Sequence, residues 1–273
     1  MAKPRRSPVA AASAQRWSIY CLGQLRVYKN GNERIKWNIP GSAPKKTRTL
    51  FAYLLNRGEQ GAHSDRIAEL LWPEGGSEKT KRARLHHTVA MLRKTLGDNN
   101  AVLRSGDYYR LNPPAGSWVD ITNFEQMCRR GVTLLKRGQE DECLKLYRAA
   151  EQLYVGDLFE DLPLEYVDNE LEEWCMPRRI WLREMAVKLH KDTSVALRRK
   201  GRLREALEHC QKALRLDPTN EDANIEIMQV FHRQGRVDTV ARQYRQYKSA
   251  MEATGTSVEG SDIQAFYRAL TLK

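Results

Sequence analysis

The stretch RKGRLREALEHCQKALRL, from Arg199, aligns without gaps with RQGRVDTVARQYRQYKSA, which begins 34 residues further on at Arg233. A third stretch, KRGQEDECLKLYRAAEQL from Lys136, aligns with both, but it precedes the first by 63 residues rather than by two full periods. Each stretch has a glycine at its third position, followed by apolar residues at helical spacing. The chain therefore contains an internal repeat with one irregular copy.

The period and the punctuation of this repeat indicate its structure. A period of 34 residues, with glycine between paired helices and a proline after the second helix, here Pro218, predicts tetratricopeptide-like repeats. Such helix pairs stack into a curved surface that commonly binds other proteins. An unrelated bundle of helices is the alternative for this region.

Residues 17–39 have the composition of short strands. The segment WSIYCLGQLRVYKNG, from Trp17, is rich in β-branched and aromatic residues and contains the turn signal Asn30-Gly31. The segment IKWNI, at residues 35–39, predicts a further strand. We therefore expect a small antiparallel sheet over residues 17–39.

Three helices and a hairpin follow this sheet. The first helix is expected in PKKTRTLFAYLLNRG, up to Gly58, and the second in DRIAELLW, with Ser64 as its cap. The third spans residues 79–96, and the segment AVLRSGDYYRL predicts a hairpin with strands at 102–104 and 108–111. This order of elements is that of a winged helix-turn-helix.

The third helix is expected to have one apolar and one polar face. Its buried stripe consists of Leu85, Val89, Leu92 and Leu96. Arg84, on the polar side, is the best candidate for reading a base, because a helix fits the major groove and arginine can hold guanine with two hydrogen bonds. Many contacts of such side chains go to phosphates, which position the protein without specifying sequence.

The candidate DNA-binding residues lie at the start of the first helix, along the third helix and in the hairpin. Cations at the start of a helix oppose its dipole, which is reasonable if a phosphate docks there; simple solvation is the alternative. In the hairpin, Tyr109 is expected to pack in the core, whereas its neighbours could form a wing against the DNA. The full set is Lys45, Lys46, Arg48, Thr80, Lys81, Arg82, Arg84, His87, Arg93, Lys94, Arg104, Tyr108 and Arg110.

The charge of the chain is divided unevenly. Residues 1–119 hold 21 Lys and Arg and 8 Asp and Glu, whereas residues 120–273 hold 25 and 26, so the formal net charge of +12 lies in the first part. This asymmetry indicates a polyanionic partner for that part. Nucleic acid is the first candidate, an anionic membrane is the rival, and a basic surface without a partner is the third interpretation.

Several classes of protein are excluded by what the sequence lacks. There is no run of about 18 apolar residues, and the basic segment Met1–Ala14 has no apolar core, so neither a membrane span nor a secretory signal is predicted. The five cysteines form no CxxC pair, which predicts reduced thiols in a cytoplasmic protein. No nucleotide-binding or hydrolase motif occurs, and the histidines lack metal-ligand spacing, so we expect no catalytic activity, cofactor or metal site. The acidic run ELEEW at residues 170–174, with Asp161, Glu165 and Asp168, could form a carboxylate cluster but is interpreted as a solvated helix face.

In this order the motifs resemble the SARP-type bacterial transcriptional activators, over residues 18–272. The segment CLGQLRVYKNG is similar to the family's opening strand pair, TRTLFAYLL and DRIAELLWPE to its first two helices, and ARLHHTVAMLRKTLG to its recognition helix. The segment DITNFE, from Asp120, resembles the opening of the bacterial transcriptional activator domain, and GRVDTVARQYRQYKSAMEATG resembles its closing repeat. One departure is Tyr108, where the family commonly has glycine.

The resemblance implies sequence-specific binding to promoter DNA, often by paired protomers on direct repeats, and recruitment of RNA polymerase. It assigns the recognition role to Thr80, Arg84 and His87. It places Arg93 and Lys94 near phosphates. The wing role falls on residues 104–110.

We therefore expect a mainly α protein with small antiparallel β elements, in which a winged helix-turn-helix precedes a tetratricopeptide-like domain. The expected divisions are a disordered basic tail over 1–15, the winged helix over 16–111, a linker over 112–119 and the bacterial transcriptional activator domain over 120–273. The expected function is activation of transcription from double-stranded promoter DNA, with RNA polymerase and a second protomer as partners and no membrane. The alternative is a protein-interaction adaptor whose basic module binds RNA or an acidic protein.

Overall fold

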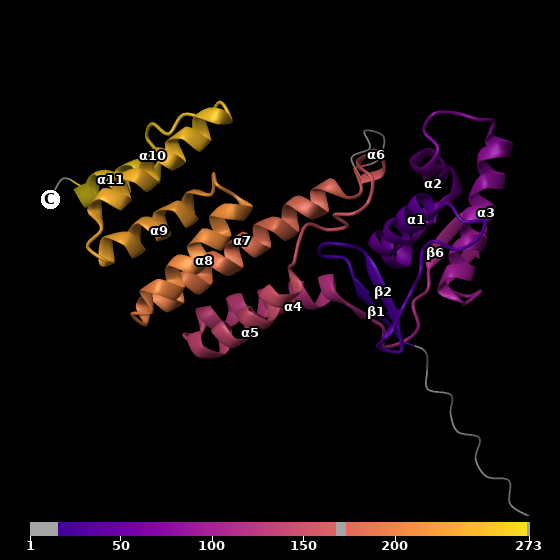
Figure 1. Cartoon of the computed structure of the whole chain (residues 1–273), viewed down its shortest axis with the longest axis horizontal. Coiled ribbons are helices and arrows are strands. Elements are labelled where there is room, and N and C mark those ends of the chain that lie inside the picture. Colours follow the sequence, from indigo (N-terminus) through magenta and orange to yellow (C-terminus); the bar gives the residue numbers. More distant parts are fainter. Residues whose placement is uncertain (1–15, 168–172, 272–273) are drawn as a thin grey trace, which may run out of the picture. The chain divides into compact units, whose positions relative to one another are not determined.

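A computed structural model describes residues 16–167 and 173–271 of the chain (Figure 1). These residues form two compact units. The first comprises Met1–Ile121 and Leu158–Pro177, and the second comprises Thr122–Asp157 and Arg178–Lys273. The expected boundary at residue 119 therefore differs from the division in the structure, because the segment Leu158–Pro177 returns to pack with the first unit. The expected tail, residues 1–15, lies outside the described residues.

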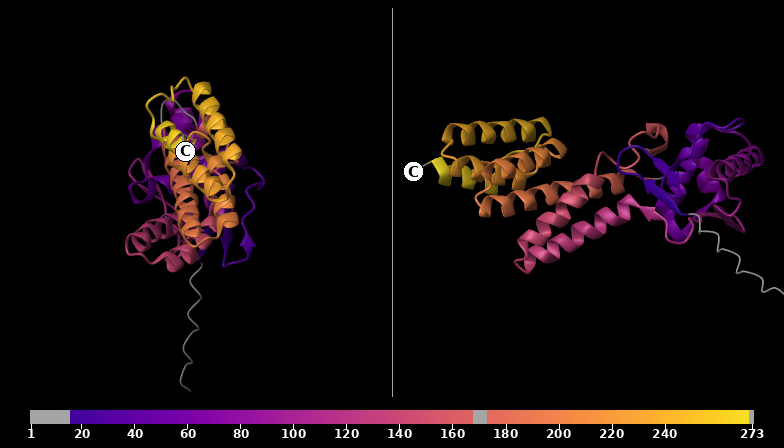
Figure 2. Two further views of the ribbon diagram at one scale, coloured as in Figure 1. Left: turned by 90° about the vertical axis from the view of Figure 1, so that its left-hand side faces the viewer. Right: turned by 60° about the horizontal axis from the view of Figure 1, so that its bottom comes forward.

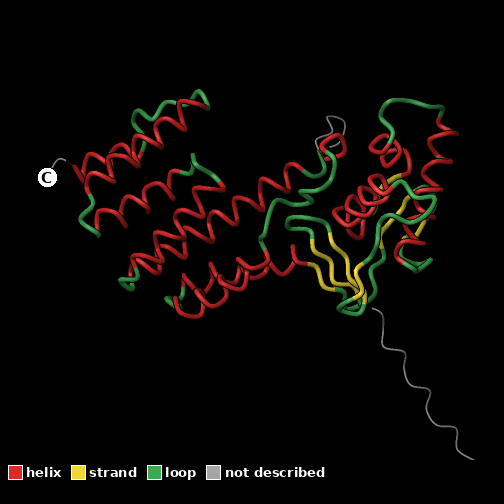
Figure 3. The backbone as a smooth tube through the Cα atoms, viewed as in Figure 1, coloured by secondary structure: helices red, strands yellow, loops and turns green. Residues whose placement is uncertain are grey.

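The first unit opens with a four-stranded sheet in the order β3-β2-β1-β7. Its strands, shown in yellow in Figure 3, are β1 (Trp17–Tyr20), β2 (Arg26–Lys29), β3 (Glu33–Arg34) and β7 (Trp118–Val119). Neighbours pair antiparallel except for β7, which pairs parallel with β1. The expected linker, residues 112–119, thus ends in a strand of the sheet.

The strand expected at residues 35–39 is not formed. The amide of Ile35 still donates to the carbonyl of Val27, at 2.9 Å, but the chain then leaves the sheet. The ring of Trp37 packs edge-on against Phe51, with ring centroids 5.4 Å apart. Packing of this half-buried indole against α1 (Pro44–Arg57) explains why a segment of strand-like composition does not extend the sheet.

Two further helices and a three-stranded sheet complete the winged helix. The helices are α2 (Ser64–Leu71) and α3 (Glu78–Leu96), and the sheet, in the order β4-β6-β5, contains β4 (Ala62–His63), β5 (Val102–Ser105) and β6 (Tyr108–Leu111). The expected helices and hairpin are confirmed. The cap of α2 is displaced by one residue, because Ser64 is buried as the first helical residue and His63 Nδ1 accepts from the amide of Asp65, at 3.3 Å.

The core of this unit is the apolar stripe predicted for α3. Leu85, Val89, Leu92 and Leu96 are all buried and lie against α1, whose Leu50 and Phe51 are also buried. Because this stripe is buried, the face of α3 on the other side of the helix points to solvent. The fold thus leaves the polar face of α3 available.

Two carboxylates tie the turn between β1 and β2 to later parts of the chain. Asp120 accepts from the amides of Cys21 and Leu22, at 2.7 and 2.9 Å. Asp161 accepts from the amide of Leu25, at 2.9 Å, and forms an ion pair with Arg48. The segment that contains Asp161 is therefore part of the winged-helix unit.

The second unit consists of helices, most of which are joined in succession by short turns (Figure 2, right); a longer segment separates α5 from α7. It is built from α4 (Asp120–Lys136), α5 (Glu140–Leu153), α7 (Met176–Arg199), α8 (Leu203–Leu216), α9 (Glu221–Arg233), α10 (Val237–Ala253) and α11 (Asp262–Thr271). The short α6 (Leu164–Val167) belongs to the first unit. The residues of α4 up to Ile121 also belong to the first unit.

The three aligned sequence stretches have the same turn in the structure. Gly138, Gly201 and Gly235 each join two helices and have φ between 71 and 74°. Each glycine amide donates to the carbonyl three residues before it, and the next amide donates to the carbonyl five residues before it. A residue with a Cβ is strained at such a φ, so glycine is required there. The first copy is irregular because the segment Leu158–Pro177 is inserted between α5 and α7.

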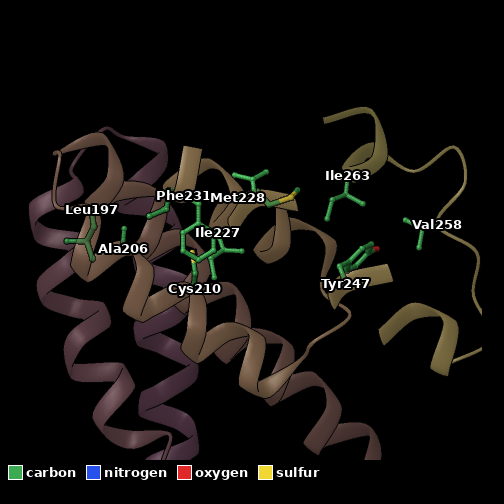
Figure 4. Packing of buried hydrophobic residues seen from close by; sticks show 11 residues of the cluster. Leu197, Ala206, Cys210, Ile227, Met228, Phe231, Tyr247, Val258 and Ile263 are labelled. Atoms are coloured by element: carbon green, nitrogen blue, oxygen red, sulfur yellow. The ribbon is translucent and has the colours of Figure 1, made fainter. Parts of the chain in front are cut away.

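A continuous apolar core joins α7 to α11 (Figure 4). It is formed by buried residues of every helix in this range, including Leu197, Cys210, Phe231, Tyr247 and Ile263. All five cysteines of the chain are buried and free. Among the described residues, no helix has both the length and the apolar character needed to cross a bilayer.

Candidate nucleic-acid interface

The N-terminal end of α3 presents polar side chains on a well-defined first turn. The hydroxyl of Ser77 accepts from the amide of Thr80, at 3.3 Å, and lies 2.9 Å from the hydroxyl of Thr80. This cap fixes where the helix begins and how Thr80 is oriented. Thr80, Ala83 and Arg84 are exposed, whereas Leu85 is buried, so the polar residues lie on the solvent face as the sequence predicts.

Arg84 lines a cavity of about 390 Å³ together with Lys46. The ammonium of Lys46 donates to the carbonyl of Leu71, at 2.6 Å, and lies 4.7 Å from the centre of the Trp72 ring. Lys46 thus satisfies a carbonyl at the C-terminal end of α2, where the helix dipole favours a cation. Burial, and then the charge of Arg84, lower the pKa of Lys46. The cavity is lined by these two cations and also by Glu74 and Glu165, so its wall carries charges of both signs.

Besides Lys46 and Thr80, four predicted DNA-binding residues of α1 and α3 have partners within the protein. Arg93 donates twice to the carbonyl of Val102, at 3.0 Å from Nε and 2.6 Å from Nη2. His87 Nε2 lies 3.0 Å from the carbonyl of Gly41. Their polar atoms hold α3 against neighbouring segments. This structural role was not predicted from the position of the two residues in the sequence.

The remaining two of these residues are in ion pairs. Arg48 is half-buried and pairs with Asp161. Arg82 pairs with Asp65 at 3.5 Å, and both side chains are exposed, so this second pair is weak and can open. Lys46 and Arg48, which the sequence places together with Lys45 at a phosphate site, therefore both have structural partners.

The hairpin β5–β6 forms the wing. Its turn places Gly106 at a φ of 60°, so Tyr108, which replaces the family's glycine, can take part in the extended strand β6. Tyr109 is buried, as predicted, and Tyr108 is 53% exposed with its ring against His63. Arg104 donates to the carbonyl of Gly106, at 2.8 Å, and so stiffens the turn.

A group of cations keeps its donors available to a ligand. Within the described residues, these side chains make no hydrogen bond or ion pair: Lys45, Lys79, Lys81, Arg84, Lys94 and Arg110. All are exposed except Lys81, which is half-buried. Lys79 was not among the predicted residues, although its position beside Thr80 at the start of α3 could have indicated it.

Sequence position did not reveal the roles of Asp161 and Trp174, which belong to the segment Leu158–Pro177. Residues 168–172 of the acidic run lie outside the described residues. The interpretation as a solvated helix face is wrong for Asp161, which is half-buried in its ion pair, and for Trp174, which is buried with its indole N–H donating to the carbonyl of Tyr166, at 2.7 Å. The irregular spacing of the first repeat was the available signal that something is inserted here.

The winged helix with tetratricopeptide-like helix pairs after it is the architecture of the SARP-type bacterial transcriptional activators. Residues 119–270 match the model of the family described as the bacterial transcriptional activator domain. The chain belongs to this family. The resemblance found in the sequence motifs is thereby confirmed for the family and the fold.

Several solved structures are similar to this chain, among them the following two. EmbR of Mycobacterium tuberculosis, in complex with a low-affinity phosphopeptide, matches with a TM-score of 0.76 and 20% sequence identity over 94% of this chain. The chain spans 65% of the length of that protein. A tetratricopeptide-containing C-terminal domain of a Plasmodium falciparum FK506-binding protein matches with a TM-score of 0.40 and 13% identity, over 56% of this chain and 89% of that one. No curated protein matches the sequence.

Proposed function

We propose that the chain activates transcription by binding double-stranded promoter DNA with α3 in the major groove and the β5–β6 hairpin against the backbone. The observation that supports this most directly is the solvent face of α3, where Thr80, Arg84 and Lys94 are exposed on the side opposite the buried stripe. A helix with this division of faces fits the major groove and can reach base edges. Lys79 and Lys94, which are exposed cations of the same helix, suit contacts with the phosphate backbone.

The structure supports separate roles for the predicted residues. Arg84 and Thr80 are the candidates for base contacts, because they are exposed at the end of the helix that the Ser77 cap orders. Lys45, Lys94 and Arg110 are the candidates for phosphate contacts, because they are exposed and without partners among the described residues.

Four of the remaining predicted residues act mainly through the fold. Lys46 and Arg48 position the start of α1, and His87 and Arg93 position α3. The others lie at the border of the proposed surface and extend it: Lys81, Arg82, Arg104 and Tyr108.

For the repeat unit we propose contacts with RNA polymerase or with a second protomer. Its exposed positions include Arg204, which is 93% exposed and pairs with Glu208, and Arg242, which lines a cavity of about 460 Å³ between α8, α9 and α10. Helix repeats commonly present such surfaces to other proteins.

Selection of bound sequences from random duplex DNA, with the full chain, tests the proposal. Enrichment of one motif supports a sequence-specific regulator. Uniform enrichment contradicts it and favours the adaptor, whose basic module binds RNA or an acidic protein. Including Arg34→Ala, which removes one positive charge from the exposed edge strand β3, controls for loss of charge alone.

A further inference from the structure

Three polar side chains converge in the second unit, where α5, α7 and α8 meet. Glu151 comes from α5, His190 from α7 and His209 from α8. One donor atom of each lies within 4.8 Å of the other two. The cluster is unrelated to the proposed DNA-binding surface, which belongs to the other unit.

The two imidazole rings approach each other with the same atom, Nδ1. Their Nδ1 atoms are 3.1 Å apart, and the ring centroids are 5.4 Å apart at an angle of 41°. In a tetrahedral zinc site with Zn–N bonds of about 2.0–2.1 Å, donor atoms lie roughly 3.3 Å apart. The separation of the two nitrogens is therefore close to that of two ligands of one ion.

The third donor and the burial of the cluster also fit a metal site. Imidazole and carboxylate together are a donor set that suits Zn²⁺, and two histidines with one glutamate leave a fourth position for water. His190 is only 7% exposed, while Glu151 is 24% exposed at its side chain, so an ion could enter from the Glu151 side.

Lys212 competes with a metal ion for the carboxylate of Glu151. Its ammonium pairs with Oε1 of Glu151. A carboxylate has a second oxygen, so Glu151 can keep this partner while it binds an ion, but the positive charge of Lys212 opposes a cation nearby. Without an ion, one imidazole can donate to the other across the 3.1 Å gap.

We propose that Glu151, His190 and His209 bind one Zn²⁺ ion per chain. The site joins α5, from the first helix pair, to α7 and α8, from the second. Because the helix pairs of a repeat array contact only their neighbours, an ion at this junction strengthens the coupling between two successive repeats.

Calorimetric titration of the untagged, chelator-treated full chain with Zn²⁺ tests the site. One ion should bind per chain, and the unfolding temperature should rise with Zn²⁺ concentration, because an ion that binds only the folded state stabilises it. Mg²⁺, which prefers oxygen ligands, should have no such effect. Co²⁺ in the same site should give the visible absorption of a tetrahedral complex.

Matched variants locate the ion. His209→Gln and Glu151→Gln should each weaken binding at least about tenfold, since even partners outside the first coordination shell contribute that much. His232→Gln, at an exposed histidine of α9, should bind as the parent does. Lys212→Gln should bind roughly two- to fivefold more tightly, since it removes a competing ion pair.

Several results would overturn the assignment. These are the lack of one-to-one binding, undiminished binding by a correctly folded His209→Gln variant, and equal loss of binding in His232→Gln. Unchanged or weaker binding by Lys212→Gln would place the ion away from Glu151 and would overturn it as well.

Discussion

Arg84 and Lys46 lie beside the same cavity, yet the structure gives the two cations different tasks. Lys46 is committed to the carbonyl of Leu71 and the ring of Trp72, whereas Arg84 is exposed and makes no hydrogen bond or ion pair among the described residues. Both residues were predicted as DNA contacts from sequence position alone. Only the contacts of the folded chain distinguish a side chain that positions an element from one that can reach a ligand.

Replacement of Arg84 by alanine should relax sequence preference. If the guanidinium holds a base, the variant should lose roughly 1–3 kcal/mol on the selected site and little on scrambled DNA. Lys94→Ala should instead weaken both by a similar factor, as loss of a phosphate contact does. Affinities on the two duplexes, measured at one salt concentration, decide the matter, and an equal loss for Arg84→Ala would reassign Arg84 to the backbone.

Replacement of Asp120 by alanine should destabilise the first unit by about 2–6 kcal/mol. The variant leaves the buried amides of Cys21 and Leu22 without their acceptor, and each unsatisfied group costs about 1–3 kcal/mol. Urea unfolding of the full chain measures this. Glu59→Ala, at an exposed acidic residue, is the control and should change stability by less than about 0.5 kcal/mol.

Within α4, a glycine sits where helix propensity alone would favour alanine. A Cβ at Gly131 would lie 1.9 Å from a ring carbon of Tyr147, which is buried in α5. Alanine in a helix gains about 1 kcal/mol over glycine, but overpacking a core costs about 1–3 kcal/mol or more. The clash should therefore prevail, and Gly131→Ala should lower the unfolding temperature. Leucine removes the ring that the new methyl group would meet, so the double variant Gly131→Ala, Tyr147→Leu should recover part of the stability that Gly131→Ala loses. If the effects of the two changes were additive, that would contradict direct contact between residues 131 and 147.

Most helices of the chain could be predicted because their signals are local. The stripe from Leu85 to Leu96 and the glycines of the repeat turns lie within single windows of sequence, and the structure has them where they were expected. The prediction of a strand at residues 35–39 is wrong, because the packing of Trp37 against Phe51 overrides local strand propensity.

The parts that could not be predicted depend on contacts between distant residues. The bond from Leu25 to Asp161 joins positions 136 apart, and the bond from Cys21 to Asp120 joins positions 99 apart. The cluster of Glu151, His190 and His209 likewise comes from three helices. Periodicity carries no information about such pairs. The irregular spacing of the first repeat signals an inserted segment but not where that segment packs, and nothing in the sequence indicates the proposed metal site.

At the scale of the whole molecule, DNA binding by the full chain should depend strongly on salt. Each phosphate neutralised contributes a slope of about −0.9 to the plot of log affinity against log salt concentration. Replacing Lys45 or Arg110 by alanine should each make this slope shallower by about one. Electrophoretic shifts at several salt concentrations measure it, with Arg34→Ala as the control, and a slope that no variant changes would place the phosphate contacts elsewhere.

Reversing charge on the repeat unit should separate DNA binding from activation. Arg204 and Arg242 are exposed and lie in the unit without the proposed DNA surface, so Arg204→Glu and Arg242→Glu should bind a single site normally. Transcription from a paired site with purified polymerase should fall if these residues contact a partner protein. Normal transcription and normal loading onto paired sites would show that the partner surface lies elsewhere.

A fragment of residues 16–119 should be less stable than the same residues in the full chain. It lacks Asp120, Asp161 and Trp174, and thereby loses the acceptors of several amides and a buried indole that packs on Tyr53. Its unfolding temperature and its affinity for duplex DNA should both be lower, and a fragment extended to residue 177 should recover much of both. Equal stability of the two fragments would show that the returning segment is dispensable.

The return of the chain to its first unit also affects the order of events during synthesis. A ribosome must translate as far as Pro177 before every residue of this unit exists. An incomplete product released before that point has α3 but not the segment that closes the fold of the first unit. Premature termination should therefore give polypeptides that proteases remove quickly, rather than stable fragments of the first unit.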